Sequence, residues 1–423
     1  MVIVSAAIGL YYAVKSRNKT ATMEDYLLGG RKMGLFPISC SLIATSLTGT
    51  SIVGLTAETY AYGTHSWLYS VCFTIMAICN TFIFLPVFSE LKLTSSFKYL
   101  EMRFNRRVRL LASGLFLLTG LIFLPITVYV PALTFQSVTG VNTHTTVVVL
   151  SLLCAAYTAL GGFKAVVWTD VVQLALMIVS FIVVIVIGTN TVGGFENVFE
   201  AGKRGQRLII LNAEEVNTRT SMYGMILSNA FTATYQFGLS QTNLQRFISL
   251  PSLNKMRISA WILSIAFSLF FFLSVFLGLV VYANYETCDP FKAGFIKKID
   301  QILPYFIQEK ASFFHGFNGI FIAGIFSASL STTSSYFNAM SGIIYEDFLS
   351  KRFPNIKDRT VGNIMKATTF ALGILQIFLV FFVEKLGMVM KMTLQVMAIN
   401  SATLITLFIL GILIPKANSK VRL

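Results

Sequence analysis

Long apolar stretches alternate with short polar connections along the whole of this 423-residue chain. Most of the stretches reach the roughly 20 residues that an α-helix needs to cross a bilayer, and few charges interrupt them. They predict a polytopic membrane protein with helical spans. The first stretch is short and is expected to be a truncated crossing. The eleven predicted helices are 1–14, 34–56, 66–88, 109–137, 144–160, 166–189, 221–245, 258–284, 313–343, 361–384 and 390–414.

Polar residues are concentrated in one of these stretches, 313–343. Seven Ser and Thr hydroxyls fall within residues 327–336, and no residue there is charged. Hydroxyls at membrane depth are unfavourable unless they face something polar. A dense group of neutral oxygens suits a small dehydrated cation, whereas a proton relay needs a titratable side chain. The competing interpretation is helix packing, because Ser and Thr let helices approach closely and hydrogen-bond across the contact.

Two other stretches are interrupted by polar residues at corresponding places. Residues 44–51 read Ala-Thr-Ser-Leu-Thr-Gly-Thr-Ser, and residues 228–243 hold several Ser, Thr, Asn and Gln. The two spans are five apart, so they would open the two halves of a protein built from five-helix repeats. Paired interrupted helices at matching positions indicate an inverted-repeat transporter. The alternative is that Gly49 and Gly238 only allow close packing.

The Lys and Arg residues that give the net charge of +15 are distributed unevenly among the connections between the helices. A basic excess can indicate a nucleic-acid partner, but here 23 of the 33 Lys and Arg fall in alternate connections. Short basic loops stay in the cytoplasm. The pattern therefore puts the amino terminus outside and the carboxyl terminus in the cytoplasm, and it excludes nucleic acid as the explanation. The basic connections are 15–33, 89–109, 161–165, 246–257, 344–366 and the tail from 415.

The titratable residues form no catalytic set. Glu58 and Asp170 lie in or near spans and are expected to be structural, with Asp170 capping or pairing at the inner end of its helix. The three His residues, His65, His144 and His315, lie at span ends. Because no nucleophile–base pair or metal-ligand group lies at one depth, the sequence predicts a protein that is not an enzyme and has no cofactor.

Four segments spread along the chain carry distinctive motifs. They are Tyr157–Gln173 at the turn between two spans, Gln241–Arg246, Tyr26–Arg31, and the hydroxyl patch that ends at Asn338. Together they resemble the solute:sodium symporter family. Within that family, the segments that resemble the branch carrying multivitamins, monocarboxylates and iodide are Gly54–Thr64 and Val128–Leu133.

The resemblance implies an all-α, multi-pass plasma-membrane protein with a LeuT-like fold. That fold is a five-plus-five inverted repeat, here preceded by one extra helix. The implied divisions are a leading helix and cytoplasmic loop at 1–33, a first repeat at 34–190, an extracellular loop at 191–220, a second repeat at 221–414 and a cytoplasmic tail at 415–423.

The resemblance also implies a sodium site that joins two helices. Its ligands would be the backbone carbonyls of Ala44, Leu47 and Ala328 and the hydroxyls of Ser331 and Thr332. Residues 328, 331 and 332 share one helix face. Five neutral oxygens suit a monovalent cation, because a divalent ion normally recruits carboxylates. The remaining hydroxyls are expected to pack, to bond back to their own helix or at most to form a second cation site; they are Ser329, Thr333, Ser334 and Ser335.

The segment Ala233–Gly238 and Ser46 depart from the pattern of the family's sugar carriers, which argues against a hexose. The implied function is sodium-coupled symport of a small organic or inorganic anion by alternating access. Sodium is then the coupling ion, and the solute and the lipid bilayer are the other partners. The alternative is a solute sensor or ligand-gated conductance that does not transport. The residues expected to line the solute cavity are Thr48, Ser51, Tyr129, Tyr235 and Gln241.

Overall fold

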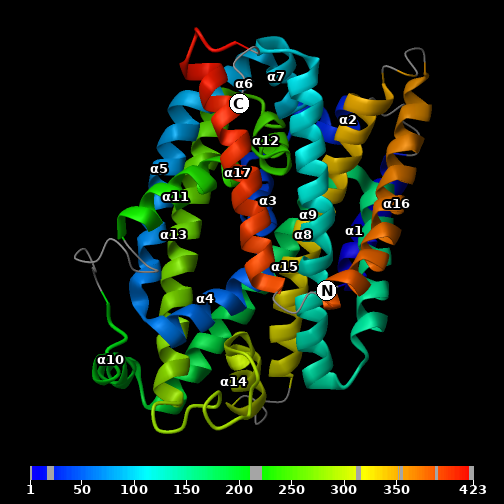
Figure 1. The fold of residues 1–423 in the computed structure, drawn as a ribbon. Coiled ribbons are helices and arrows are strands. Elements are labelled where there is room, and N and C mark those ends of the chain that lie inside the picture. The colour runs from blue at the N-terminus through cyan, green and yellow to red at the C-terminus, as the bar shows by residue number, and fades with distance from the viewer. Residues whose placement is uncertain are drawn as a thin grey trace.

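The protein is a bundle of long helices that run between two ends covered by shorter helices (Figure 1). The computed structural model describes residues 2–16, 23–209, 222–310, 316–350, 352, 356–385 and 389–418. All regular secondary structure within these ranges is helical.

Each of the eleven predicted spans coincides with helix in the described ranges. Three 3-10 segments cover Gly29–Arg31, Thr64–Leu68 and Ile299–Gln301, and three π-helical turns cover Asn80–Phe84, Tyr235–Leu239 and Ile344–Leu349. The α-helices are α1 (Val2–Ser16), α2 (Met23–Leu28), α3 (Leu35–Ser46), α4 (Gly49–Tyr62), α5 (Tyr69–Cys79), α6 (Leu85–Leu91), α7 (Ser96–Arg103), α8 (Arg106–Thr139), α9 (Thr143–Val192), α10 (Phe195–Arg204), α11 (Met222–Thr234), α12 (Gln241–Ile248), α13 (Leu253–Asn284), α14 (Ile302–Lys310), α15 (Phe317–Ile343), α16 (Asp358–Lys385) and α17 (Val389–Leu413).

Helix α9 holds two of the predicted spans in one 50-residue element. A straight helix of that length would measure about 75 Å, more than twice the hydrocarbon core. The helix breaks at Gly162, which has φ 61° and ψ −161°. Glycine adopts positive φ readily, and a Cβ at this position would lie 3.1 Å from the ring of Tyr26. The two crossings of α9 are therefore joined at Gly162.

Both predicted helix interruptions are confirmed. Helices α3 and α4 meet at 55°, and the chain between them is extended at Leu47 and Thr48. In the second interruption α11 passes into the π-helical turn Tyr235–Leu239. The chain then leaves helical geometry at Ser240, which has φ −56° and ψ 142°, before α12 begins. Each interruption leaves backbone groups without partners in their own helix.

Helix α15 lies at the centre of the bundle. Every residue from Gly324 to Ile343 is buried, and the helix packs against α3, α8, α9, α12 and α16. The hydroxyl patch therefore faces protein and not lipid. By contrast, outer helices expose large apolar side chains such as Phe382 of α16, which is 69% exposed. Seven described helices are long and apolar enough to cross a membrane, or eight when α3 and α4 count as one bent span.

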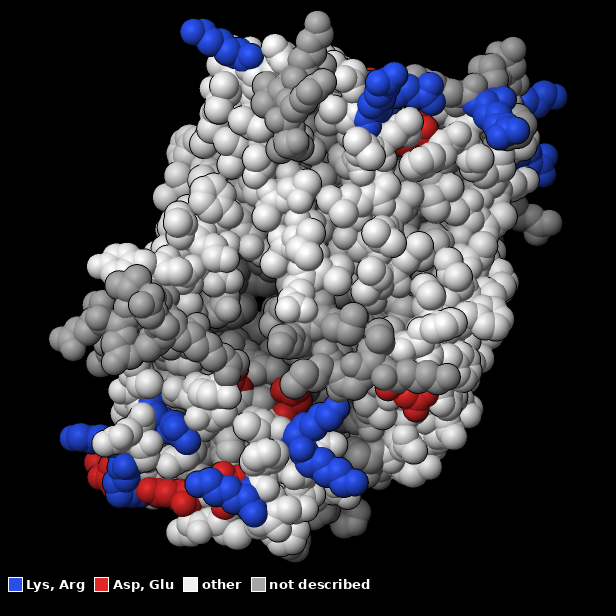
Figure 2. Space-filling model, in the orientation of Figure 1, with Lys and Arg blue, Asp and Glu red and all other residues white. Residues whose placement is uncertain are grey.

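Charged side chains separate toward the two ends of the molecule. Lys and Arg gather at the end that carries α2 and α7, whereas the opposite end, near α10 and α14, mixes both signs (Figures 1 and 2). Between the two ends the visible surface is almost free of charge (Figure 2). A broad uncharged band of this kind is the surface expected to contact lipid.

Candidate cation and solute site

The carboxyl end of α3 presents backbone carbonyls that a continuous helix would have used. Because the chain is extended at Leu47 and Thr48, the last carbonyls of α3 lose their usual partners. Thr48 then caps α4, and its hydroxyl oxygen accepts a hydrogen bond from the Ser51 N–H at 3.1 Å. Ala44 and Leu47 are both buried at this break.

Helix α15 meets these carbonyls with the predicted pair of hydroxyls. Ser331 donates to the carbonyl of Ala44 at 2.5 Å. Thr332 donates at 3.0 Å to the carbonyl of Thr45 and at 3.0 Å to that of Ala328 on its own helix. The structure thus brings together four of the five predicted ligand residues, and all of them are buried.

The fifth predicted ligand residue, Leu47, lies at the break itself. Its N–H closes the last turn of α3 by donating to the carbonyl of Ile43 at 3.0 Å. The whole set consists of neutral oxygens from two helices that are remote in the sequence. Carbonyls of an unwound helix together with hydroxyls suit a monovalent cation. Ser331 and Thr332 would accept such an ion once their protons turn away from the carbonyls.

The other hydroxyls of α15 have separate partners. Ser329 donates to the carbonyl of Thr127 on α8 at 2.6 Å. Thr333 and Ser334 bond back to their own helix, to the carbonyls of Ser329 at 2.8 Å and of Ser331 at 3.1 Å. The prediction of packing and back-bonding is confirmed for these three residues.

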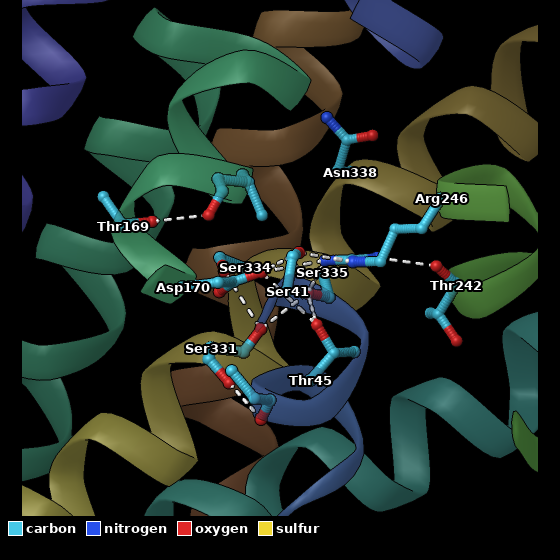
Figure 3. Close-up of polar contacts among 12 residues, drawn as sticks. Ser41, Thr45, Thr169, Asp170, Thr242, Arg246, Ser331, Ser334, Ser335 and Asn338 are labelled. Carbon is cyan, nitrogen blue, oxygen red and sulfur yellow. Dashed lines mark hydrogen bonds and ion pairs between the residues drawn. The ribbon is translucent and has the colours of Figure 1, made fainter. Parts of the chain in front are cut away.

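Ser335 also bonds back to Ser331, but it joins a buried charged network next to the predicted site (Figure 3). The ion pair in this network joins Arg246 Nη2 to Asp170 Oδ2 at 3.2 Å. Ser41 donates to Asp170 at 2.5 Å and accepts from Arg246 Nε at 2.7 Å. The Ser335 hydroxyl accepts from Arg246 and lies 2.8 Å from the hydroxyl of Thr45. The network therefore ties α3, α9, α12 and α15 together.

The predicted pairing of Asp170 is confirmed, but its partners were not identified from the sequence. In the sequence Arg246 stands out only as the end of the motif Gln241–Arg246, and Ser41 carries no signal of its own. One general signal would have found the pair: an Arg and an Asp inside membrane spans are unfavourable alone and are expected to pair. Both side chains are at most 1% exposed, so each neutralises the other within the bundle.

The two interrupted helices touch at their breaks. The side-chain amide of Asn243 on α12 donates to the carbonyl of Gln236 at 2.8 Å and to the hydroxyl of Ser46 at 3.3 Å. Ser46 is the last residue of α3. Asn243 therefore joins the two interrupted helices by a side-chain hydrogen bond at their breaks.

Two of the five predicted solute-lining residues lie at the α3–α4 break, and a third lies on α8, which packs against α4. The hydroxyls of Thr48 and Ser51 are 2.7 Å apart at the start of α4. A Cβ on Gly49 would lie 3.4 Å from Pro131 Cγ, so this start packs against α8. Tyr129 lies on α8, two residues before Pro131.

The remaining two predicted solute-lining residues lie along the second interrupted helix. Tyr235 is fully buried in the π-helical turn, and its carbonyl accepts from the Ser240 N–H at 2.7 Å. Gln241 directly follows Ser240 and is the first residue of α12. Its side-chain oxygen, Oε1, accepts from the Ser96 N–H at 2.8 Å, which places this side chain against the start of α7.

Sequence comparison finds relatives that match nearly the whole chain. The model of the sodium:solute symporter family matches residues 26–421. Sodium-coupled monocarboxylate transporter 2 of Mus musculus is 32% identical over 419 residues, which are 99% of this chain and 68% of that protein. A putative sodium-dependent multivitamin transporter of Drosophila melanogaster is 31% identical over 426 residues, covering 99% of this chain and 70% of that protein.

The fold itself is found in a solved structure. A Na⁺-coupled sialic acid symporter, in a substrate-bound outward-open state, superposes with a TM-score of 0.86. The match covers 99% of this chain and 86% of the other, at 22% sequence identity. At this identity the likeness concerns the fold alone, and it confirms the predicted LeuT-like helical architecture.

Proposed function

We propose, since this chain belongs to the sodium:solute symporter family, that it couples the inward movement of sodium to the uptake of a small anion across the plasma membrane. The observation that carries the proposal is the contact between α3 and α15. There the Ala44 carbonyl meets Ser331 at 2.5 Å, and the Thr45 carbonyl meets Thr332 at 3.0 Å. In our proposal the sodium ligands are the oxygens of Ala44, Leu47, Ala328, Ser331 and Thr332.

The position of these ligands supplies a means of coupling. Sodium held between α3 and α15 would favour the state in which the two helices are close. A ligand shifts a conformational equilibrium only through its different affinities for the two states. We infer that bound sodium stabilises an outward-facing state to which the solute then binds. Alternating access follows when both ligands are released on the cytoplasmic side.

The anionic character of the solute is supported by the start of α4. The helix begins at Gly49, so its first N–H groups and the positive end of its dipole point into the break. In our proposal the residues that line the solute cavity at this break are Thr48, Ser51, Tyr129 and Tyr235. The relatives named for monocarboxylates and for multivitamins make a monocarboxylate or a vitamin-like acid the first solutes to test.

We expect sodium-dependent uptake of at least one monocarboxylate, vitamin-like acid or small inorganic anion in cells that express the protein, and no uptake of glucose. Radiolabelled solutes, offered with sodium or with choline in its place, provide the measurement. Robust glucose uptake without anion uptake would contradict the proposed solute class. Solute-evoked currents without any accumulation of label would instead support a ligand-gated conductance.

We expect the connection 15–33 to be cytoplasmic, because it contains five Lys and Arg. The sequon Asn18-Lys19-Thr20 provides a direct test, although it lies outside the described residues. In microsomes Asn18 should stay unmodified, while a sequon inserted near Asn197 should receive a glycan. Glycosylation at Asn18 would reverse the proposed orientation.

A further inference from the structure

Helix α12 is a short half-helix with no exposed side chain. All eight of its residues, Gln241 to Ile248, are buried. Gln245 donates to the carbonyl of Leu27 and, at 2.8 Å, to the side chain of Asn338. Together with the bonds of Asn243 and Arg246, these contacts fasten α12 to several different elements. Helix α12 lies within the bundle, toward the end where α2 and α7 lie (Figure 1).

Gln241 adds a further attachment of α12, to the residues at the start of α7. Its side-chain oxygen accepts from the N–H of Ser96 at 2.8 Å and from the hydroxyl of Ser96 at 3.1 Å. Its side-chain nitrogen donates to the carbonyl of Thr94 at 3.2 Å. Three hydrogen bonds therefore join the first residue of α12 to residues 94–96, which are the end of the loop before α7 and the first residue of α7 and are called here the loop 94–96. Gln241 is only 5% exposed.

The same loop is bonded to the far end of α15. The hydroxyl of Thr94 contacts both carboxylate oxygens of Glu346 at 2.9 Å. Glu346 also forms an ion pair with Arg109 of α8 at 3.3 Å. The π-helical turn that contains Glu346 continues directly from α15, the helix with Ser331 and Thr332. A continuous chain of polar contacts thus runs from α12 through residues 94–96 to the base of α15.

We propose that Gln241 is a positioning residue that latches the inner half-helix α12 to the loop 94–96 and so holds the cytoplasmic pathway shut. This inference rests on the proposed transport function and assigns Gln241 a role apart from solute binding. Because the loop is also bonded to α15, opening of the latch is linked to the helix that would hold sodium. Loss of the latch favours the inward-open state, which has released its sodium.

The test uses cytoplasmic accessibility, which does not depend on transport. Thr242→Cys reports on α12, and a membrane-impermeant maleimide is applied to inside-out vesicles in the full-length protein. Adding Gln241→Leu should raise the labelling rate about threefold or more, and sodium should partly suppress the increase. In uptake assays the sodium concentration for half-maximal transport should rise by about 3- to 10-fold.

Gln376→Leu is the matched control. Gln376 is also a buried glutamine that donates to a backbone carbonyl, that of Leu124 at 3.0 Å, but it lies on α16. This variant should leave the labelling of Thr242→Cys unchanged. Equal labelling in the Gln241 and Gln376 variants would overturn the latch.

Two further results keep the inference separate from the proposed function. If Gln241→Leu fails to reach the membrane, Ser96→Ala serves in its place. This substitution removes the hydroxyl that donates to Gln241 and leaves the Ser96 N–H, so a smaller rise in the labelling rate of Thr242→Cys is expected. An unchanged labelling rate in that variant would also overturn the latch. If the unmodified protein shows no sodium-dependent uptake, the proposed function fails, while the labelling experiment still decides whether Gln241 holds α12 closed.

Discussion

Ser331→Ala and Thr332→Ala should each raise the sodium concentration for half-maximal uptake by about 5- to 100-fold. Each substitution removes one neutral oxygen from a buried site that contains no carboxylate to replace it. Leaving a buried polar partner unmatched costs about 1–3 kcal/mol, which corresponds to roughly one to two decades in affinity. The measurement is solute uptake as a function of sodium concentration, normalised to protein at the cell surface.

Ser329→Ala is the control for this experiment. Its hydroxyl bonds to the Thr127 carbonyl on α8 at 2.6 Å and so lies off the proposed sodium face. This variant should leave the sodium concentration for half-maximal uptake near that of the unmodified protein. Damage to packing would instead lower expression or the maximal rate. If both Ser331→Ala and Thr332→Ala also keep the original sodium dependence, the contact between α3 and α15 only packs the two helices together and does not bind sodium.

Arg246→Met should destabilise the folded protein by about 3–5 kcal/mol, because it leaves the carboxylate of Asp170 buried without its counter-charge. Asp170 is 0% exposed, and the remaining Ser41 and Thr45 hydroxyls do not supply a positive charge. We expect the melting temperature of the detergent-solubilised protein to fall by roughly 3–6 °C. The double variant Arg246→Met, Asp170→Asn should recover more than half of that loss, because no charge is then buried.

An exposed ion pair provides the comparison for Arg246. Arg204 bonds to Glu286 at 3.0 Å, but its side chain is 59% exposed. Arg204→Met should therefore change stability by only about 0–1 kcal/mol. If Arg246→Met is no more destabilising than Arg204→Met, the charges of Arg246 and Asp170 do not stabilise the bundle.

The sequence by itself determined the spans and the two interrupted helices, and its resemblance to a known family supplied the candidate sodium ligands. Spans follow from the length and composition of each stretch, which are local properties of the chain. The breaks at Leu47 and Ser240 lie where polar residues and glycine weaken a helix in an otherwise apolar stretch. Ser331 and Thr332 could be assigned because the hydroxyl patch is dense and because the motifs around it resemble a known family.

Only the tertiary structure decided which remote residues meet. Ala44 and Ser331 are 287 positions apart, and Asp170 and Arg246 are 76 apart. No pattern within one helix indicates that Ser41 and Ser335 complete the buried ion pair. Gln241 shows the same principle, because its polar character fits a solute cavity and a buried interhelical contact equally well. Its partner, the loop 94–96, is set by how α12 packs against the rest of the bundle, and that packing depends on all the helices together.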